Sequence, residues 1–139
     1  MDPTRQNRKR DKNMRGTEAE DLRILIVEDE FLIALELESS LLDAGYRVVG
    51  IAVTAKEAVA MARSEQPDLV IMDIRLADRS DGVDAAVELF DTFGIRSIFA
   101  SAHADAETRK RAAPAKPIGW VQKPYSGEAL IRLIREVCG

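Results

Sequence analysis

The chain has 139 residues, of which 46% are hydrophobic and 32% are charged, and this composition is typical of a single globular domain. No apolar run approaches the roughly 20 residues of a membrane-spanning helix, and the charged amino terminus lacks the apolar stretch of a signal peptide. The single cysteine, Cys138, excludes an internal disulfide and agrees with a cytoplasmic protein.

Charge divides the chain into two parts. The first twenty residues contain six basic and four acidic side chains and almost no apolar ones, which predicts a disordered basic tail over residues 1–20. Residues 21–139 form the predicted domain, with 14 basic and 20 acidic side chains. This acidic surplus argues against binding of nucleic acid by the domain itself. The tail could contact nucleic acid or an acidic partner, but we expect it to be a solvated extension.

After the tail, short apolar runs alternate with amphipathic segments. The runs rich in valine, isoleucine and leucine predict strands, and apolar residues at helical spacing predict helices. Strands are expected at 23–27, 46–53, 69–73, 95–100 and within 117–122. Helices are expected at 31–44, 54–66, 83–93, 104–113 and from 126 to about 137.

Glycine, proline and capping residues indicate where several of these elements begin or end. Gly45 and Gly94 follow two of the helices, and glycine is the common residue at that position. Thr54 with Glu57 three residues later predicts a capping box at the start of the second helix. Pro114 is expected to end the fourth helix, and the polar segment 74–82 is predicted to be a loop.

Five strands that alternate with five helices predict an α/β fold with a parallel sheet and right-handed crossovers. The expected strand order is 2-1-3-4-5, the doubly wound, flavodoxin-like arrangement. In such sheets ligands bind at the carboxyl ends of the strands, next to the point where the strand order reverses. That point lies between strands one and three.

Polar residues follow the strands at this edge. Strand one is followed by Glu28 and Asp29, strand three ends in Asp73, and strands four and five are followed by Ser101 and Lys123. Two carboxylates 4 Å apart repel each other by about 4 kcal/mol at an effective dielectric constant near 20. A bound cation relieves that repulsion, and oxygen ligands without histidine or cysteine favour Mg²⁺ or Mn²⁺.

Each of these residues also has a plainer interpretation. Glu28 and Asp29 could favour the amino terminus of the following helix. Asp73 alone could be a loop residue, Ser101 a helix cap and Lys123 part of a solvated turn. The combination at four strand ends of one sheet favours a nucleophilic aspartate that is surrounded by groups for phosphoryl transfer.

The chain resembles the receiver domain of two-component response regulators, with a CheY-like fold. The residues that carry the resemblance are Ile26-Val27-Glu28-Asp29-Glu30, Ile71-Met72-Asp73, Phe99-Ala100-Ser101-Ala102 and Gln122-Lys123-Pro124-Tyr125. The match covers residues from about Arg23 to Val137.

The resemblance implies a role for each site residue. Asp73 would accept a phosphoryl group from a histidine kinase or a histidine phosphotransfer protein. Mg²⁺ would be bound by Asp29, Asp73 and the backbone carbonyl of Arg75, with Glu28 acting through a metal-bound water. Phosphoryl oxygens would be bound by Ser101, Lys123 and the backbone amide of Ala102.

The family's switch would run through Ser101 and an aromatic residue, here Trp120. Trp120 could instead be a permanent packing residue. The expected output surface consists of the helix at 104–113, the strand within 117–122 and the last helix. This surface would bind a downstream protein or a second copy of the chain. The protein would be a signalling receiver that catalyses only its own phosphorylation and dephosphorylation, without binding a membrane.

Three residues depart from the family's pattern. Ala77 stands where many receivers have a proline, and the loop to Gly82 is longer by one residue. Arg75 and His103, each two residues beyond a site residue, predict an altered lifetime of the phosphorylated state. His103 is expected to be an exposed residue at the start of a helix.

We expect a stand-alone receiver, and three alternatives stand against it. The chain could be a receiver fragment of a longer regulator, or an interaction module that is not phosphorylated. The intact set of acidic, serine and lysine residues argues against the second. The third alternative is a metal-dependent phosphatase that forms an aspartyl phosphate. Such an enzyme would need a second aspartate two residues after the nucleophile, and Arg75 at that position argues against it.

Overall fold

The computed structural model describes residues 21–138, so the predicted disordered tail lies outside the described residues. The strands are β1 (Arg23–Val27), β2 (Arg47–Ala52), β3 (Leu69–Asp73), β4 (Ser97–Ser101) and β5 (Gly119–Gln122). The α-helices are α2 (Phe31–Asp43), α3 (Ala55–Glu65), α4 (Gly82–Phe93), α5 (Ala106–Ala112) and α6 (Gly127–Cys138). Two short 3₁₀ helices are η2 (Ala77–Arg79) and η3 (Ala113–Ala115).

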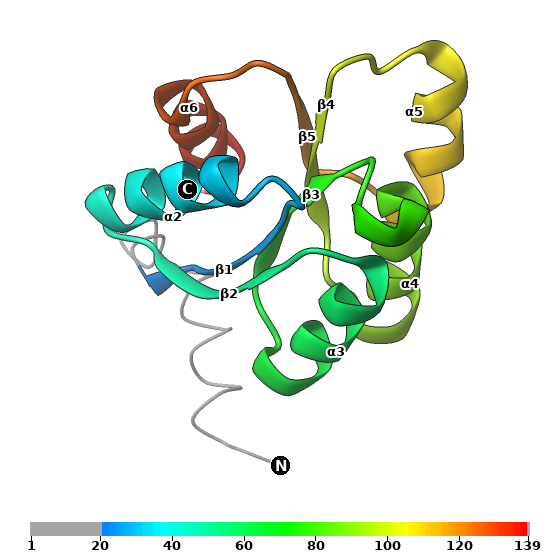
Figure 1. Ribbon diagram of the computed structural model, residues 1–139, viewed down its shortest axis with the longest axis horizontal. Helices are drawn as coiled ribbons and strands as arrows, with labels where there is room; N and C mark the ends of the chain where they lie inside the picture. Colours follow the sequence, from blue (N-terminus) through cyan, green and yellow to red (C-terminus); the bar gives the residue numbers. More distant parts are fainter. Residues whose placement is uncertain (1–20, 139) are drawn as a thin grey trace.

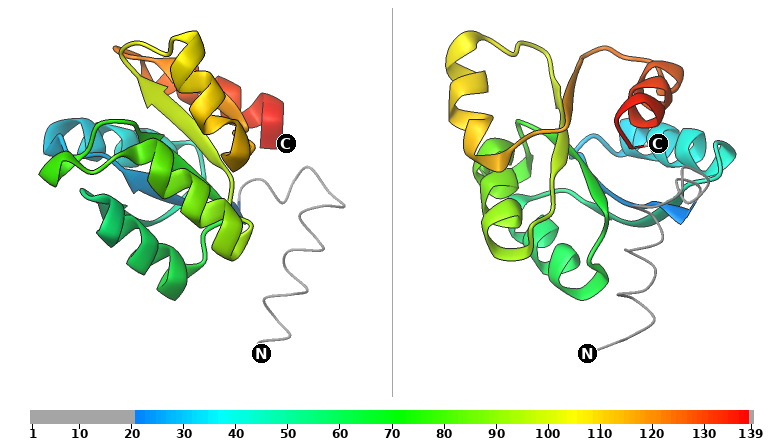
Figure 2. Two further views of the ribbon diagram at one scale, coloured as in Figure 1. Left: turned by 90° about the vertical axis from the view of Figure 1, so that its right-hand side faces the viewer. Right: turned by 180° about the vertical axis from the view of Figure 1, so that it is seen from behind.

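The sheet has the predicted architecture. All neighbouring strands are parallel, and their order is β2-β1-β3-β4-β5. Helices α2 and α6 cover one face of the sheet, and α3, α4 and α5 cover the other (Figures 1 and 2). Because every strand runs in the same direction, all five carboxyl ends meet at one edge. Among the described residues, no helix is both long and apolar enough to cross a membrane.

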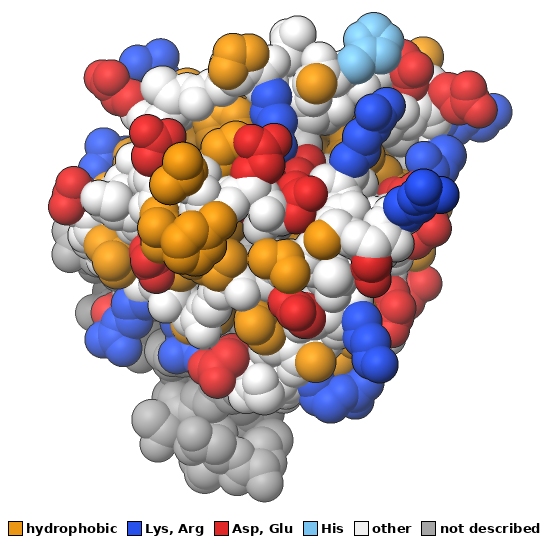
Figure 3. All heavy atoms as spheres, viewed as in Figure 1, with side chains coloured by type: hydrophobic (Ala, Val, Ile, Leu, Met, Phe, Trp, Pro, Cys, Tyr) orange, Lys and Arg blue, Asp and Glu red, His pale blue; other side chains and the backbone are white. Residues whose placement is uncertain are grey.

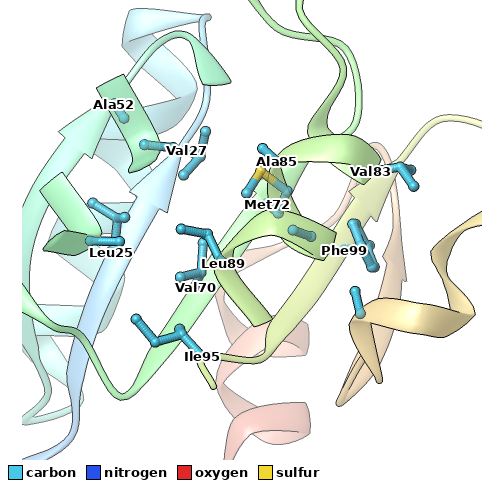
Figure 4. Close-up of a cluster of buried hydrophobic side chains, with 14 of the residues drawn as sticks. Leu25, Val27, Ala52, Val70, Met72, Val83, Ala85, Leu89, Ile95 and Phe99 are labelled. Atoms are coloured by element: carbon cyan, nitrogen blue, oxygen red, sulfur yellow. The ribbon is translucent and has the colours of Figure 1, made fainter. Parts of the chain in front are cut away.

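Strand β3 is at the centre of two hydrophobic layers. Its five residues are all buried, and alternate side chains point to opposite faces of the sheet. Val70 and Met72 pack with Leu89 of α4 in one layer (Figure 4). Leu69 and Ile71 pack in the other layer, which is covered by α2 and α6. Burial on both faces explains why the strand's sequence is a continuous apolar run.

Local structure confirms three of the predicted helix-end signals. The Thr54 hydroxyl accepts from the Glu57 amide at 3.1 Å, and the Glu57 carboxylate accepts from the Val53 amide at 3.0 Å. Gly94 ends α4 with a positive φ of 71°, a conformation that glycine adopts without steric cost. The Ser126 hydroxyl accepts from the Ala129 amide at 3.0 Å, as expected of a residue that caps α6.

Several boundaries differ from the prediction. Strand β4 begins at Ser97, because the Ile95 amide still donates to the Leu89 carbonyl and belongs to the turn after α4. The segment 74–82 contains the 3₁₀ helix η2, and α4 starts at Gly82. Helix α5 has only seven residues, Ala106–Ala112, where 104–113 was predicted, and the chain continues as η3 around Pro114.

Candidate functional site

The predicted site residues come together at the carboxyl edge of the sheet. One carboxylate oxygen from each of Glu28, Asp29 and Asp73 lies within 4.8 Å of the other two. Glu28 and Asp73 are buried, with 2% and 6% of their surfaces exposed, whereas Asp29 is exposed. Buried carboxylates this close repel each other strongly unless a positive charge lies between or beside them.

Lys123 supplies one such charge. Its Nζ lies 3.0 Å from Oε1 of Glu28 and 3.2 Å from Oδ2 of Asp73. The other Glu28 oxygen, Oε2, accepts a hydrogen bond from the Glu30 amide at 3.1 Å. Sequence reasoning assigned Lys123 to phosphoryl oxygens and missed its contact with Glu28. Both residues follow predicted strands, but β1 and β5 are not neighbours in the sheet, so the contact depends on the reach of the lysine.

One lysine does not balance the acidic cluster. Burial and the charge of Glu28 raise the pKa of Asp73 from 3.8 to about 7, against the lowering influence of Lys123. For Lys123, burial lowers the pKa, but hydrogen bonds and charges from Glu28 and Asp73 outweigh it and raise the pKa overall. Three carboxylates with one cation leave a net negative charge. This donor set fits a small divalent cation that prefers oxygen ligands, such as Mg²⁺.

The acidic cluster opens into a cleft of about 780 Å³. The Ser101 hydroxyl accepts from the His103 amide at 3.0 Å and keeps its own hydrogen for donation. The Arg75 amide approaches Oδ1 of Asp73 at 3.4 Å. Two predicted site residues do not line this cleft: Glu28, which contacts Lys123, and Trp120, the predicted switch residue. The lining members are Asp29, Asp73, Arg75, Ser101, Ala102 and Lys123.

Comparison with known proteins agrees with this geometry. The sequence model of one protein family, the response regulator receiver domain, matches residues 24–135 of the chain. The chain is a member of the response regulator receiver domain family. In this receiver domain the buried aspartate that ends β3, the acidic pair after β1, the serine that ends β4 and the lysine after β5 lie at one edge of the sheet.

Relatives of this receiver domain include regulators from several bacteria. The transcriptional regulatory protein PdtaR of Mycobacterium tuberculosis is 38% identical over 112 residues, which are 81% of this chain and 54% of that protein. The phyllosphere-induced regulator PhyR of Methylorubrum extorquens is 42% identical over 110 residues, or 78% of this chain and 41% of that protein. The receiver thus spans about half the length of these two relatives.

A solved structure has the same fold. The signal receiver domain of a modulated diguanylate cyclase from Desulfovibrio desulfuricans superposes with a TM-score of 0.76 at 35% identity. The match covers 85% of this chain and 94% of that one. The fold and the strand order predicted for the receiver are therefore confirmed.

Trp120 lies beneath α5, away from the cleft. Its ring stacks on Phe99 with centroids 4.7 Å apart and an angle of 28° between the ring planes. The guanidinium carbon of Arg109 lies 4.6 Å from the centroid of the Trp120 ring. The half-buried indole is thus packed between an aromatic ring of β4 and a cation of α5. Trp120 therefore contacts both strand β4 and helix α5.

Arg75 and His103 lie at the rim of the cleft, and both are exposed. Nε2 of His103 is 3.9 Å from Oδ2 of Asp105, the residue that caps α5. His103 therefore precedes α5 as an exposed side chain, which confirms the expected placement.

Gly82 is a residue whose importance the sequence did not reveal. Its amide donates to the Ile74 carbonyl at 2.7 Å, and a Cβ atom here would collide with the carbonyl oxygen of Asp73. The start of α4 therefore packs directly against the backbone of the site. A glycine next to the capping residue Asp81 was the available signal, but it does not say which backbone comes close.

Proposed function

We propose that this receiver accepts a phosphoryl group on Asp73 from a phosphohistidine of a histidine kinase or a histidine phosphotransfer protein, in a step that requires Mg²⁺. The main support is the setting of Asp73. It is buried at the end of the central strand, it shares its surroundings with two other carboxylates, and Lys123 lies 3.2 Å from its oxygen.

In the transfer, an oxygen of Asp73 attacks the phosphorus, and the bond between phosphorus and the donor's ring nitrogen breaks. The electron pair of that bond remains on the imidazole, and Asp73 becomes an acyl phosphate. Asp29, Asp73 and the Arg75 carbonyl would hold Mg²⁺, which neutralises negative charge on the transferred group. Lys123, the Ser101 hydroxyl and the Ala102 amide would bind the phosphoryl oxygens.

Glu28 has two roles in this proposal. It would reach the metal ion through a bound water, and it also pairs with Lys123, which contacts Asp73 as well. The 3.0 Å contact between Lys123 and Glu28 supports the second role. Because Lys123 contacts both acids, the lysine is already oriented when the phosphoryl group arrives.

The proposed donor surface is helix α2. Hydrophobic side chains gather over this helix in Figure 3, and Phe31, Leu32 and Leu35 are exposed by 66%, 78% and 39%. Phe31 begins the helix directly after the acidic residues that follow β1. A partner that packs on these side chains would bring its histidine to the cleft.

The proposed output surface comprises α5, β5 and α6. Phosphorylation adds acceptor oxygens next to Ser101 and Lys123, which pulls the loop between β4 and α5 toward the phosphoryl group. Trp120 then shifts its packing between Phe99 and Arg109, and the surface changes shape. A downstream protein or a second copy of the chain would bind this surface, which carries basic side chains on two helices: Arg109, Lys110, Arg111, Arg132 and Arg135.

The experiment that tests the proposal is intact-mass spectrometry after incubation with a small acyl phosphate donor and Mg²⁺. The wild type is expected to gain one phosphoryl group, and the gain should disappear in D73N and with a chelator. D91N, which changes an exposed aspartate of α4, is the matched control and should be phosphorylated normally. A protein that neither binds Mg²⁺ nor gains a phosphoryl group would be an interaction module instead.

A further inference from the structure

A charged contact links helix α5 to the loop between β3 and α4. Nη2 of Arg111 donates to Oδ2 of Asp81 at 2.6 Å and lies 3.6 Å from Oδ1 of Asp84. Pairing with Asp81 raises the pKa of the Arg111 guanidinium, although the arginine is largely exposed. The two partners are 30 residues apart in the sequence, so the contact joins two separate elements.

Asp81 also closes the loop to which it belongs. Its Oδ1 accepts from the Val83 amide at 2.7 Å and caps α4. Its backbone forms an antiparallel bridge with Arg75, and the next amide, of Gly82, donates to the Ile74 carbonyl at 2.7 Å. Residues 81–82 therefore lie beside residues 74–75, which directly follow Asp73 in the chain. Any shift of Asp81 is transmitted to the backbone of Arg75.

The Arg75 carbonyl is the backbone ligand in the proposed metal site. We infer that Arg111 and Asp81 act as a positioning pair, which holds this carbonyl in place for the cation and so makes Mg²⁺ binding depend on the position of α5. The inference rests on the proposed function, because it assigns a role in that same site. It adds a second connection between the site and α5, separate from the loop that joins Ser101, at the end of β4, to α5.

Charge alone predicts the opposite result, and this makes the inference testable. Arg111 is a cation near an acidic metal site, so its loss would strengthen Mg²⁺ binding if only long-range charge mattered. Loss of a positioning residue weakens binding, because the backbone ligand is no longer held. The direction of the change therefore distinguishes the two explanations.

Four variants are needed. R111Q removes the cation, and D81N removes the anion while keeping an oxygen that can cap α4, because asparagine is as good a cap as aspartate. The double variant R111Q/D81N leaves the net charge unchanged. K110Q removes a charge from the adjacent, exposed position of α5 and is the matched control. Mg²⁺ affinity is measured by calorimetry, and amide hydrogen exchange of residues 74–82 is followed with and without Mg²⁺.

We expect R111Q and D81N each to weaken Mg²⁺ binding by about three- to fivefold, as befits an ion pair at the rim of the site. The double variant should bind no better than either single variant, and loop amides should exchange faster in all three. K110Q should bind Mg²⁺ as tightly as the wild type or more tightly.

Several results would overturn the inference. Tighter binding by R111Q, or a double variant with wild-type affinity, would show that only charge matters. A lower unfolding temperature in chelator with unchanged Mg²⁺ affinity would show a merely structural pair. If the wild type itself binds no Mg²⁺, the proposed function fails as well, so that the two failures are told apart in the same titration.

Discussion

The half-buried Lys123 and the buried Glu28 form an ion pair across two strands that are not neighbours in the sheet. The nitrogen of Lys123, which follows β5, lies 3.0 Å from the carboxylate of Glu28, which follows β1. The same nitrogen is 3.2 Å from Asp73 at the end of β3. The lysine is thus the only cation recorded in contact with these two buried acids within the part of the chain that the structure describes. Several properties of the site depend on it.

Replacing Lys123 by methionine should destabilise the protein in chelator. K123M leaves Glu28 and Asp73 buried without their cation, and removing the partner of a buried charge in this way costs about 3 kcal/mol. The double variant E28Q/K123M should recover much of that loss, because one of the unpaired acids is gone. Urea unfolding in chelator measures both. Equal stability of K123M and the wild type would contradict a pair of this strength.

The raised pKa of Asp73 predicts how stability changes with pH in the absence of metal. The folded protein binds this proton more tightly than the unfolded chain does, because the pKa rises from 3.8 to about 7 on folding. The resulting destabilisation is small below about pH 4 and complete above about pH 7. D73N lacks this ionisation, so it should be more stable than the wild type at pH 8, with the difference shrinking toward pH 4.

This comparison is made by urea unfolding in chelator at several pH values, with D91N as a control. D91N alters an exposed aspartate and should follow the wild type at every pH. A D73N variant that is less stable than the wild type at pH 8 would show that Asp73 is not the strained carboxyl of the site.

Replacing Gly82 by alanine should displace the backbone next to Asp73. In G82A the new Cβ collides with the Asp73 carbonyl oxygen, so either α4 or the end of β3 must move. We expect a loss of about 2–3 kcal/mol in the free energy of unfolding and weaker Mg²⁺ binding. G94A is the control: nothing lies within 4 Å of its added Cβ, and only the positive φ costs about 1 kcal/mol. A G82A variant as stable as G94A would contradict the close packing.

The sequence predicted the strands, and the meeting of polar residues at one edge of the sheet, because both depend on local patterns. A continuous apolar run such as 69–73 indicates a buried central strand, and a polar residue that ends such a strand lies at the binding edge. The contacts of Lys123 with Glu28 and of Arg111 with Asp81 could not be predicted. They depend on the reach of long side chains between elements that only the folded chain brings together.

The contacts of Trp120 could not be predicted either. The sequence placed this residue in a strand but did not indicate which side chains surround it. Phe99 and Trp120 are paired in register between β4 and β5, which places their rings in contact. Arg109 reaches the indole only because α5 crosses this part of the sheet. Sequence alone therefore left open whether Trp120 switches or packs, and the stacked arrangement shows that it packs in this conformation.

The cation–π contact between Arg109 and Trp120 leads to the last prediction. R109A uncovers the indole, so the emission of Trp120, the single tryptophan, should shift to longer wavelength and be quenched more strongly by acrylamide. The loss of stability should be only about 0.5–1 kcal/mol, because the contact lies at the surface. Phosphorylation of Asp73 should persist, since Arg109 is not among the residues that line the cleft. K110A, which changes the next residue of α5, should leave the emission unchanged. Identical quenching of R109A and the wild type would show that Phe99 and the core alone cover the indole.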